Sequence, residues 1–100
     1  MSTTTLDRPI LRQPEPLLRE ALGEAIRSAR LEKGVTLREL AEVACVSAGY
    51  LSELERGRKE VSSELLAAVC YALNTTVADV LIEAAGSMAL QSAAEALIAT

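Results

Sequence analysis

The apolar residues of this chain recur at spacings of three, four and seven, and no segment alternates apolar and polar residues over a useful length. Helical spacing gathers side chains on one face of a helix, whereas alternation would indicate a strand. The clearest stripes are Leu18, Leu22, Ala25, Ile26 and Ala29, and later Leu66, Val69, Cys70 and Leu73. The pattern therefore predicts an all-α fold.

Capping residues divide the pattern into short helices. Gly34 is a helix stop, and Thr36-Leu-Arg-Glu39 has the form of a capping box, in which each end residue bonds the other's backbone amide. Ser47, Ser62 and Thr76 are predicted N-caps, and Gly57, Asn74-Thr75 and Gly86 are predicted ends. The fifth helix is expected to turn Val77, Val80 and Leu81 inward. A sixth, starting at Ser87, would carry Leu90, Ala94, Leu97 and Ile98 on one side.

The two short helices between residues 36 and 57 are joined too tightly to pack antiparallel, so they must cross steeply, as in a helix-turn-helix. The second of them has an apolar rear, formed by Val46, Leu51 and Leu54. Its outward positions are small or polar, as a helix that enters the major groove requires: Ser47, Ala48, Gly49, Ser52 and Glu53. On this geometry alone, a plain helical hairpin explains the pattern about as well.

Composition excludes several functions. With 100 residues and no His, the chain has no histidine base or His-ligated metal, and its two cysteines are too few for a four-thiolate zinc site. No grouping of nucleophile and base indicates an enzyme, and nothing indicates a cofactor or a small-molecule ligand. No apolar run approaches the roughly 20 residues of a membrane span, and no signal peptide is evident, so we expect a cytoplasmic protein.

The net charge of −4 argues mildly against a nucleic-acid partner, but the charge is unevenly distributed. Residues 1–59 carry all ten Lys and Arg against nine acids, whereas residues 60–100 carry five acids and no base. The only dense basic cluster is Arg56-Gly57-Arg58-Lys59. This asymmetry hints at an interaction face, although a solvated charge run is the commoner explanation.

At this point the sequence resembles the Cro/C1-type (Xre-like) helix-turn-helix family. The resemblance covers residues 19–85, about two thirds of the chain, and rests on many spaced positions. These are Thr36-Leu37-x-x-Leu40-Ala41, Val46-Ser47, Tyr50-Leu51-Ser52-x-Leu54-Glu55-Arg56-Gly57, Ser62-x-Glu64-x-Leu66 and Ala72-Leu73-Asn74. More narrowly, residues 49–60 and 62–65 resemble the actinobacterial regulators of Clp protease genes.

The resemblance implies a compact five-helix, lambda-repressor-like domain with a short additional C-terminal helix. Residues 1–16 would be a flexible arm, 17–85 the DNA-binding domain with its helix-turn-helix at about 36–57, and 86–100 a C-terminal tail offering a candidate dimer contact. The protein would be a transcriptional activator that binds a pseudo-palindromic operator as a homodimer, with RNA polymerase as a further candidate partner.

The resemblance also assigns roles to individual residues. Arg30 and Glu55 would form a structural ion pair between the first and third helices. Thr36 and Arg38 would meet phosphate. Base-reading positions would be Ala48, Gly49, Ser52 and Glu53, and the helix cap Ser47 is counted among the DNA-binding residues. Tyr50 would pack on a sugar or phosphate, and Arg56, Arg58 and Lys59 would clamp the DNA backbone.

Two departures and several alternatives accompany this assignment. The base-reading positions lack Gln and Arg, so bidentate readout of guanine or adenine from them is excluded, and DNA shape or Arg56 and Arg58 would have to contribute. Glu53 would either accept from a cytosine amino group or lie in solvent. Cys45 and Cys70 are expected to be buried free thiols, although a redox role is an alternative, and Tyr71 is expected in the core or an interface.

The C-terminal helices carry more apolar residues than so small a bundle can bury, which predicts a two-fold dimer through them. A tail recognised by a protease is a weaker interpretation of residues 93–100. From another functional class, the chain would be a protein-binding helix-turn-helix module, such as an antitoxin or autorepressor with a protein partner.

Overall fold

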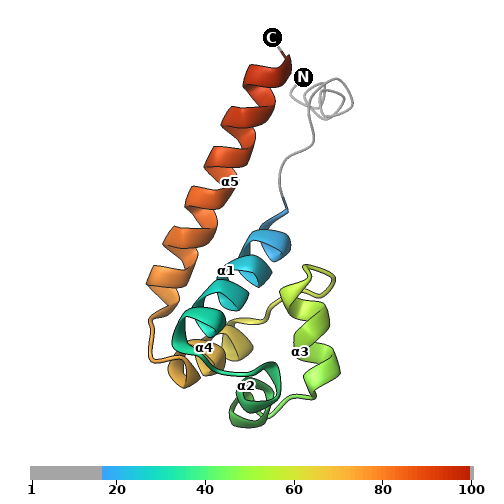
Figure 1. Ribbon diagram of the computed structural model, residues 1–100, viewed down its shortest axis with the longest axis vertical. Coiled ribbons are helices and arrows are strands. Elements are labelled where there is room, and N and C mark those ends of the chain that lie inside the picture. Colours follow the sequence, from blue (N-terminus) through green and yellow to red (C-terminus); the bar gives the residue numbers. More distant parts are fainter. Residues whose placement is uncertain (1–16, 100) are drawn as a thin grey trace, which may run out of the picture.

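The computed structural model describes residues 17–99, which form five helices and contain no strand (Figure 1). In chain order they are α1 (Leu18–Lys33), α2 (Leu37–Ala44), α3 (Ala48–Glu55), α4 (Ser63–Ala72) and α5 (Val77–Ala99). The all-α, five-helix fold class is therefore confirmed. The arm predicted at residues 1–16 lies outside the described residues.

Side-chain caps begin four of the helices at the predicted residues. The capping box of α2 is complete, with the Thr36 hydroxyl accepting from the Glu39 amide at 3.1 Å and the Glu39 carboxylate accepting from the Thr36 amide at 2.9 Å. The other three caps are hydroxyls that accept from the amide three residues on: Ser47 from Tyr50 at 3.0 Å, Ser62 from Leu65 at 3.1 Å and Thr76 from Asp79 at 3.0 Å. These bonds satisfy amides that a helix leaves without an internal partner.

Four residues in the left-handed region reverse the chain between helices. Two are glycines, Gly34 (φ 73°) and Gly57 (φ 76°), at positions where the sequence predicts stops. The others are Cys45 (φ 61°) and Asn74 (φ 55°). Asn tolerates this conformation, but Cys rarely adopts it, so a left-handed turn at Cys45 could not be expected from the residue type.

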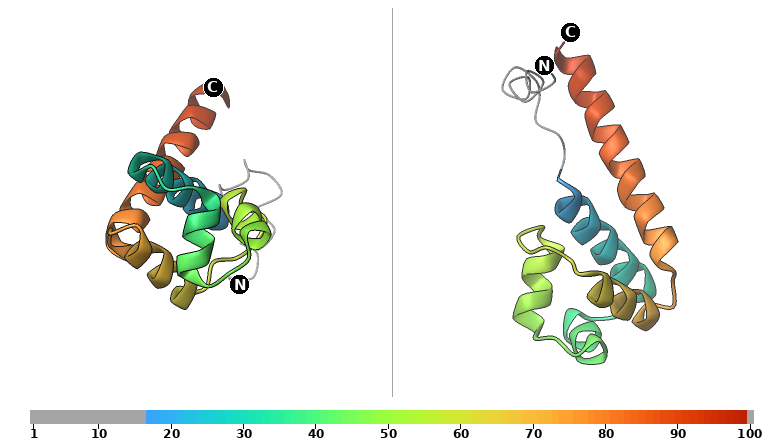
Figure 2. Two further views of the ribbon diagram at one scale, coloured as in Figure 1. Left: turned by 60° about the horizontal axis from the view of Figure 1, so that its bottom comes forward. Right: turned by 180° about the vertical axis from the view of Figure 1, so that it is seen from behind.

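One core lies where α1 to α4 meet. Ile26, Leu51, Leu54 and Val69 are fully buried, and Leu40 and Leu73 nearly so. α1 is central, since it packs against α5 on one side and α3 on the other, while α2 contacts α3 and α4 (Figures 1 and 2). The short pair α2 and α3 is thus held from behind by α1 and α4.

The sixth helix predicted from Ser87 does not exist as a separate element, because α5 continues without interruption from Val77 to Ala99. Gly86 is an interior residue of this helix. A single glycine costs an α-helix only about 1 kcal/mol, so helical neighbours on both sides suffice to carry the helix through it. As a result, the C-terminal half of α5 projects beyond the N-terminal end of α1 (Figure 1).

Two side chains predicted to be buried are exposed, and a third, predicted to lie in the core or an interface, does not lie in the core. The thiol of Cys45 is exposed, although Cys70 is buried as expected. Tyr71 is 85% exposed and so contributes nothing to the core, and Leu81 is 41% exposed where an inward position was expected. For Tyr71 and Leu81 the helix face turned to the core is narrower than the apolar stripe in the sequence. Cys45 is exposed because it follows the last residue of α2, in a left-handed turn.

Neither a membrane-spanning helix nor a metal-binding cluster is found in the described part of the chain. No single helix between residues 17 and 99 is both long and apolar enough to cross a membrane. α4 and α5 pass together by length and composition only, and they are bent by 105° relative to each other. No three His, Cys, Asp or Glu side chains among these residues lie close enough to hold a metal ion.

Candidate nucleic-acid interface

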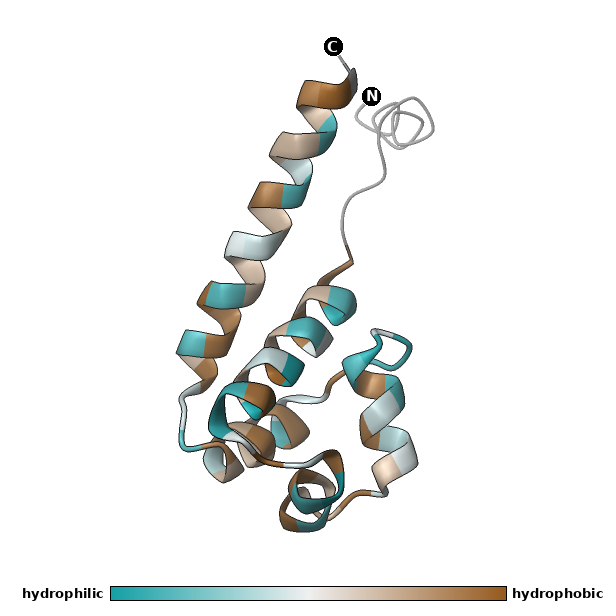
Figure 3. Cartoon of the chain, viewed as in Figure 1, coloured by the Kyte–Doolittle hydropathy of each residue, from teal (hydrophilic) through white to brown (hydrophobic). Residues whose placement is uncertain are grey.

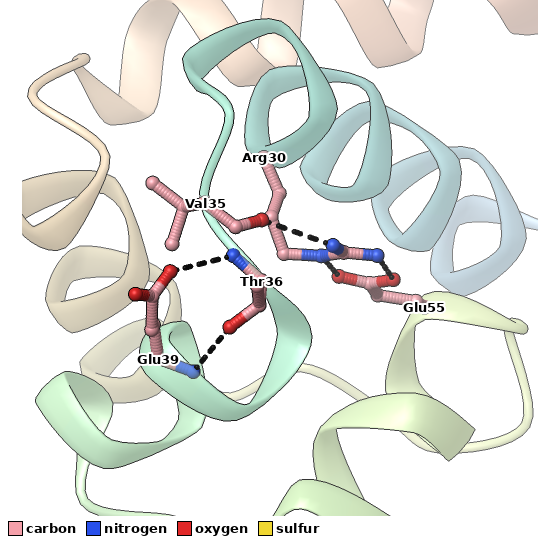
Figure 4. Close-up of polar contacts among 5 residues, drawn as sticks. All are labelled: Arg30, Val35, Thr36, Glu39 and Glu55. Carbon is pink, nitrogen blue, oxygen red and sulfur yellow. Dashed lines mark hydrogen bonds and ion pairs between the residues drawn. The ribbon is translucent and has the colours of Figure 1, made fainter.

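A buried ion pair fixes α3 against α1 (Figure 4). The Arg30 guanidinium donates from Nε to Glu55 Oε2 at 2.7 Å and from Nη2 to Glu55 Oε1 at 3.0 Å, and its Nη1 donates to the Val35 carbonyl at 3.1 Å. Both residues are buried, with 9% of Arg30 and 8% of Glu55 exposed. Two parallel bonds set the orientation as well as the distance of the two helices. This is the architectural pair that the resemblance implies.

The contact with Glu55 also favours the charged form of Arg30. The hydrogen bond that Arg30 donates to the Glu55 carboxylate raises the pKa of Arg30 above its ordinary value, while burial opposes this shift. The guanidinium therefore stays charged at any physiological pH, and the carboxylate keeps its partner. Removing either group would leave an unpaired buried charge.

Gly23 lets α3 approach α1 closely, a role that sequence reasoning missed. A Cβ atom at this position would lie 2.4 Å from the Leu54 carbonyl oxygen and 2.8 Å from that of Glu55. Only glycine fits against the last turn of α3 at this distance. The available signal was a glycine in the middle of an otherwise good helical stripe, which usually has a packing reason.

The N-terminus of α2 is partly occupied by its own capping box. Because the Glu39 carboxylate already accepts from the Thr36 amide, a phosphate at this end would meet the next amides and the exposed side chain of Arg38. Thr36 and Arg38 do lie together here, on the first turn of the helix. The helix N-terminus still favours an anion, but the protein's own carboxylate competes for it.

The outer side of α3 is small and polar, as predicted. Ser47, Gly49 and Tyr50 are exposed, and Ser52 and Glu53 are partly exposed. A Cβ at Gly49 would meet nothing within 4 Å, so open space lies in front of the helix start. Ala48 differs from the expectation, since its side chain packs partly against the core.

The basic cluster, which we define as Arg56, Arg58 and Lys59, is exposed directly after α3. Its two arginines share one carboxylate oxygen, because Glu53 Oε2 lies 3.4 Å from Arg58 Nη1 and 3.7 Å from Arg56 Nη1. Lys59 has no ion-pair partner among residues 17–99. Glu53 is thus neither simply solvated nor isolated on the outer side of α3, but tied to the cluster.

Arg19 of α1 holds the loop that carries the basic cluster, and sequence reasoning missed it as well. Its Nε donates to the Gly57 carbonyl at 3.1 Å, and its Nη1 lies 2.8 Å from Glu60 Oε2. Gly57 lies so close to α1 that a Cβ would come 2.9 Å from the Glu20 Cα. Nothing in the local sequence indicates these contacts, because they join residues about forty positions apart.

Two short crossed helices, the second fixed from behind and small and polar in front, define the helix-turn-helix class of protein. The sequence pattern of the helix-turn-helix family matches residues 26–80, and the chain belongs to this family, in its Cro/C1-type form.

The individual relatives are more specific. The chain is 56% identical over 75 residues to the transcriptional regulator ClgR of Mycobacterium tuberculosis, a match that spans 75% of this chain and 67% of that protein. The crystal structure of the clp gene regulator ClgR from Corynebacterium glutamicum is 79% identical, with a TM-score of 0.83 over 85% of this chain and 90% of the other.

A more distant structure shares the fold. It is a mutant of the restriction-modification controller protein C.Esp1396I, 28% identical, with a TM-score of 0.62 over 69% of this chain and 96% of the other. These three relatives are named as regulators or controllers and none as an enzyme, in agreement with the prediction that the chain is not an enzyme.

Proposed function

We propose that this protein is a sequence-specific regulator of transcription that binds double-stranded DNA through α3, with the basic cluster clamping the backbone. The observation that carries the proposal is the way α3 is held against α1 and what its outer side presents to solvent. A buried bidentate ion pair and a glycine contact fix its rear, its front is small and polar, and exposed cations follow it directly. A helix held in this way can enter a major groove at a fixed angle.

Thr36 and Arg38 are assigned to phosphate contacts, and Ser47, Ala48, Gly49, Ser52 and Glu53 to the groove. Since none of the residues assigned to the groove is Gln or Arg, direct readout of the bases is sparse, and part of the specificity is assigned to DNA shape. Tyr50, exposed beside Gly49, is assigned to the sugar-phosphate backbone.

The proposed assembly is a homodimer through α5. Ile82, Gly86, Leu90, Ala94 and Ile98 follow one another at intervals of four residues and are all exposed. We name them the α5 ridge. Figure 3 shows hydrophobic positions recurring along α5 as far as its C-terminal end. Leu90 is 74% and Ile98 84% exposed, which is costly for a surface that meets only water. A two-fold dimer would place two α3 helices about 34 Å apart, one turn of DNA, and so match a pseudo-palindromic operator.

The proposed biological role follows from the relatives. Similarity to two ClgR proteins, one of them named a clp gene regulator, supports a role in regulating Clp protease genes. We further propose that this regulation is activation, that RNA polymerase is a partner and that the protein acts in the cytoplasm.

A salt-dependent titration tests the DNA-binding proposal. Duplexes selected by the protein from a randomised library are compared with the unselected library, and the dissociation constant is measured at several salt concentrations. The selected duplex is expected to bind roughly a thousandfold more tightly, and binding to both should weaken steeply with salt as counterions are released.

Equal affinity for the two duplexes, or no dependence on salt, would contradict the proposal. Together with tight capture of a polypeptide, that result would favour a protein-binding module such as an antitoxin. An Arg58→Ala, Lys59→Ala variant should weaken both duplexes alike and reduce the salt slope by about 2 for each chain.

A further inference from the structure

The Glu53 carboxylate occupies a position within the basic cluster that a DNA phosphate would otherwise take. One of its oxygens lies within ion-pair distance of both arginines, at 3.4 Å and 3.7 Å. The guanidiniums of Arg56 and Arg58 are exposed and so can be reached from solvent, whereas Glu53 is partly covered. In the free protein, therefore, one carboxylate of the chain itself pairs with two of the three backbone clamps and offsets one of their two positive charges.

Any duplex that uses these clamps must replace or share the Glu53 contacts. Ion pairs between exposed side chains are weak, so a phosphate can take over the guanidiniums. Glu53 then becomes an unpaired carboxylate on the helix that faces the groove, next to a strongly negative backbone. This cost applies to every sequence.

One base can offset the cost. A carboxylate only accepts hydrogen bonds. In the major groove the cytosine amino group has an acceptor on one side only, the O6 of its paired guanine, whereas the adenine amino group lies between two acceptors, its own N7 and the O4 of the paired thymine. Glu53 therefore recovers a partner most favourably where a cytosine faces it.

We propose that Glu53 is a specificity-determining residue: it holds Arg56 and Arg58 in ion pairs that all DNA must open, and a cytosine facing α3 best replaces the lost contact. This inference rests on the proposed DNA-binding function. It explains how a helix without Gln or Arg at its base-reading positions can discriminate between DNA sequences. Glu53 lowers the affinity for sequences without the cytosine as well as raising the affinity for those that have it.

The test compares the full chain with Glu53→Gln, which keeps the shape and removes the charge. On unselected duplex, Glu53→Gln is expected to bind about fivefold more tightly, because the competing carboxylate is gone. On duplex selected by the unmodified protein the affinity should stay within about twofold, since a favourable contact is weakened at the same time. The ratio of the two dissociation constants therefore falls. Equal tightening on both duplexes would overturn the proposal.

Two further variants give measurements that would not change if Glu53 had only a structural role. Duplexes selected by Glu53→Ala should lack a cytosine position that recurs in those selected by the unmodified protein; unchanged selection contradicts the proposal. With Arg58→Ala already present, Glu53→Gln should change affinity for unselected duplex by less than about twofold, since part of the masked charge is absent. A full fivefold gain there would show that Glu53 does not act through this arginine.

Glu83→Gln on α5 is the matched control, because it removes the same charge on the far side of α1 from α3 (Figure 1). It should leave the ratio unchanged. If the unmodified protein itself fails to distinguish selected from unselected duplex, the proposed function fails; if it does distinguish them and Glu53→Gln keeps the ratio, only the inference about Glu53 fails.

Discussion

At the scale of single residues, the packing of α3 against α1 depends most on the ion pair between Arg30 and Glu55. Both charges are buried and bonded twice, so each depends on the other. We expect Arg30→Ala to lower the free energy of unfolding by about 3–5 kcal/mol, because Glu55 is left charged and buried. Urea unfolding followed by circular dichroism measures this change.

The control is the exposed pair Arg19–Glu60, where Glu60→Gln should cost less than about 1 kcal/mol. Replacing both buried partners, as Arg30→Met with Glu55→Leu, should cost less than Arg30→Ala alone, since no lone charge remains. A double variant as unstable as the single one would show that packing around Arg30, and not its charge, is what matters.

The two cysteines should differ sharply in reactivity. Cys45 is exposed, whereas Cys70 is buried and its burial raises the pKa of its thiol. Near pH 8, below the ordinary thiol pKa of about 8.5, an alkylating reagent should therefore modify Cys45 within minutes and Cys70 only after unfolding. Mass spectrometry of the peptides separates the two. Because the folded state holds the Cys70 proton more tightly, its contribution to stability declines as the pH rises past the ordinary thiol pKa.

At the scale of elements, substitution of glycine by alanine should change the stability in opposite directions at Gly23 and Gly49. Gly23→Ala should destabilise the protein by about 1–3 kcal/mol, because its Cβ meets carbonyl oxygens of α3. Gly49→Ala should stabilise it by about 0.5–1 kcal/mol, because alanine favours a helix and the space is open.

DNA affinity should not follow stability at Gly49. Its added methyl group points to the space where the proposed groove lies, so binding to selected duplex should weaken although the melting temperature rises. A Gly49→Ala protein that is more stable and binds as well as the original would show that the start of α3 does not approach DNA closely.

The elements that local chemistry defines could be predicted from the sequence. Thr36, Ser47 and Ser62 cap helices because their hydroxyls act on amides three residues away, which is a matter of spacing alone. The prediction at Gly86 was wrong because a glycine either stops a helix or lies within it, and here the helical residues on both sides carry α5 through it. The contacts of Arg19 were not predictable, since they depend on distances between elements, and for Gly23 the only signal was a glycine inside a helical stripe. The Glu53 contacts join residues three and five positions apart, but they depend on how the chain turns at Gly57 after α3.

At the scale of the whole molecule, the uneven charge along the sequence places basic and acidic side chains on different surfaces. The basic cluster follows α3, while α4 and α5 carry acids and no base. DNA would repel the second surface and attract the first. An apolar ridge on α5 therefore lies where a second copy can bind without competing for the duplex.

This division yields a prediction in which assembly and DNA binding separate. Leu90→Glu places a charge in the middle of the α5 ridge at a position already 74% exposed, so the fold should persist while the dimer dissociates. Sedimentation at micromolar concentration should then show a monomer. Binding to a duplex with two half-sites should weaken, and its salt slope should fall to about half, because each chain clamps its phosphates separately. Binding to a single half-site should be unchanged.

Ser92→Glu is the matched control, since it adds the same charge to α5 at an exposed residue outside the ridge. It should leave sedimentation and the salt slope as they are. If Leu90→Glu stays dimeric, the two chains meet elsewhere, and the half-site spacing must be derived from that other surface. The unmodified protein could also be a monomer at these concentrations and still bind paired half-sites cooperatively. In that case the α5 ridge joins two chains only on DNA, where their local concentration is high. Leu90→Glu should then abolish the cooperativity and leave the binding to a single half-site unchanged.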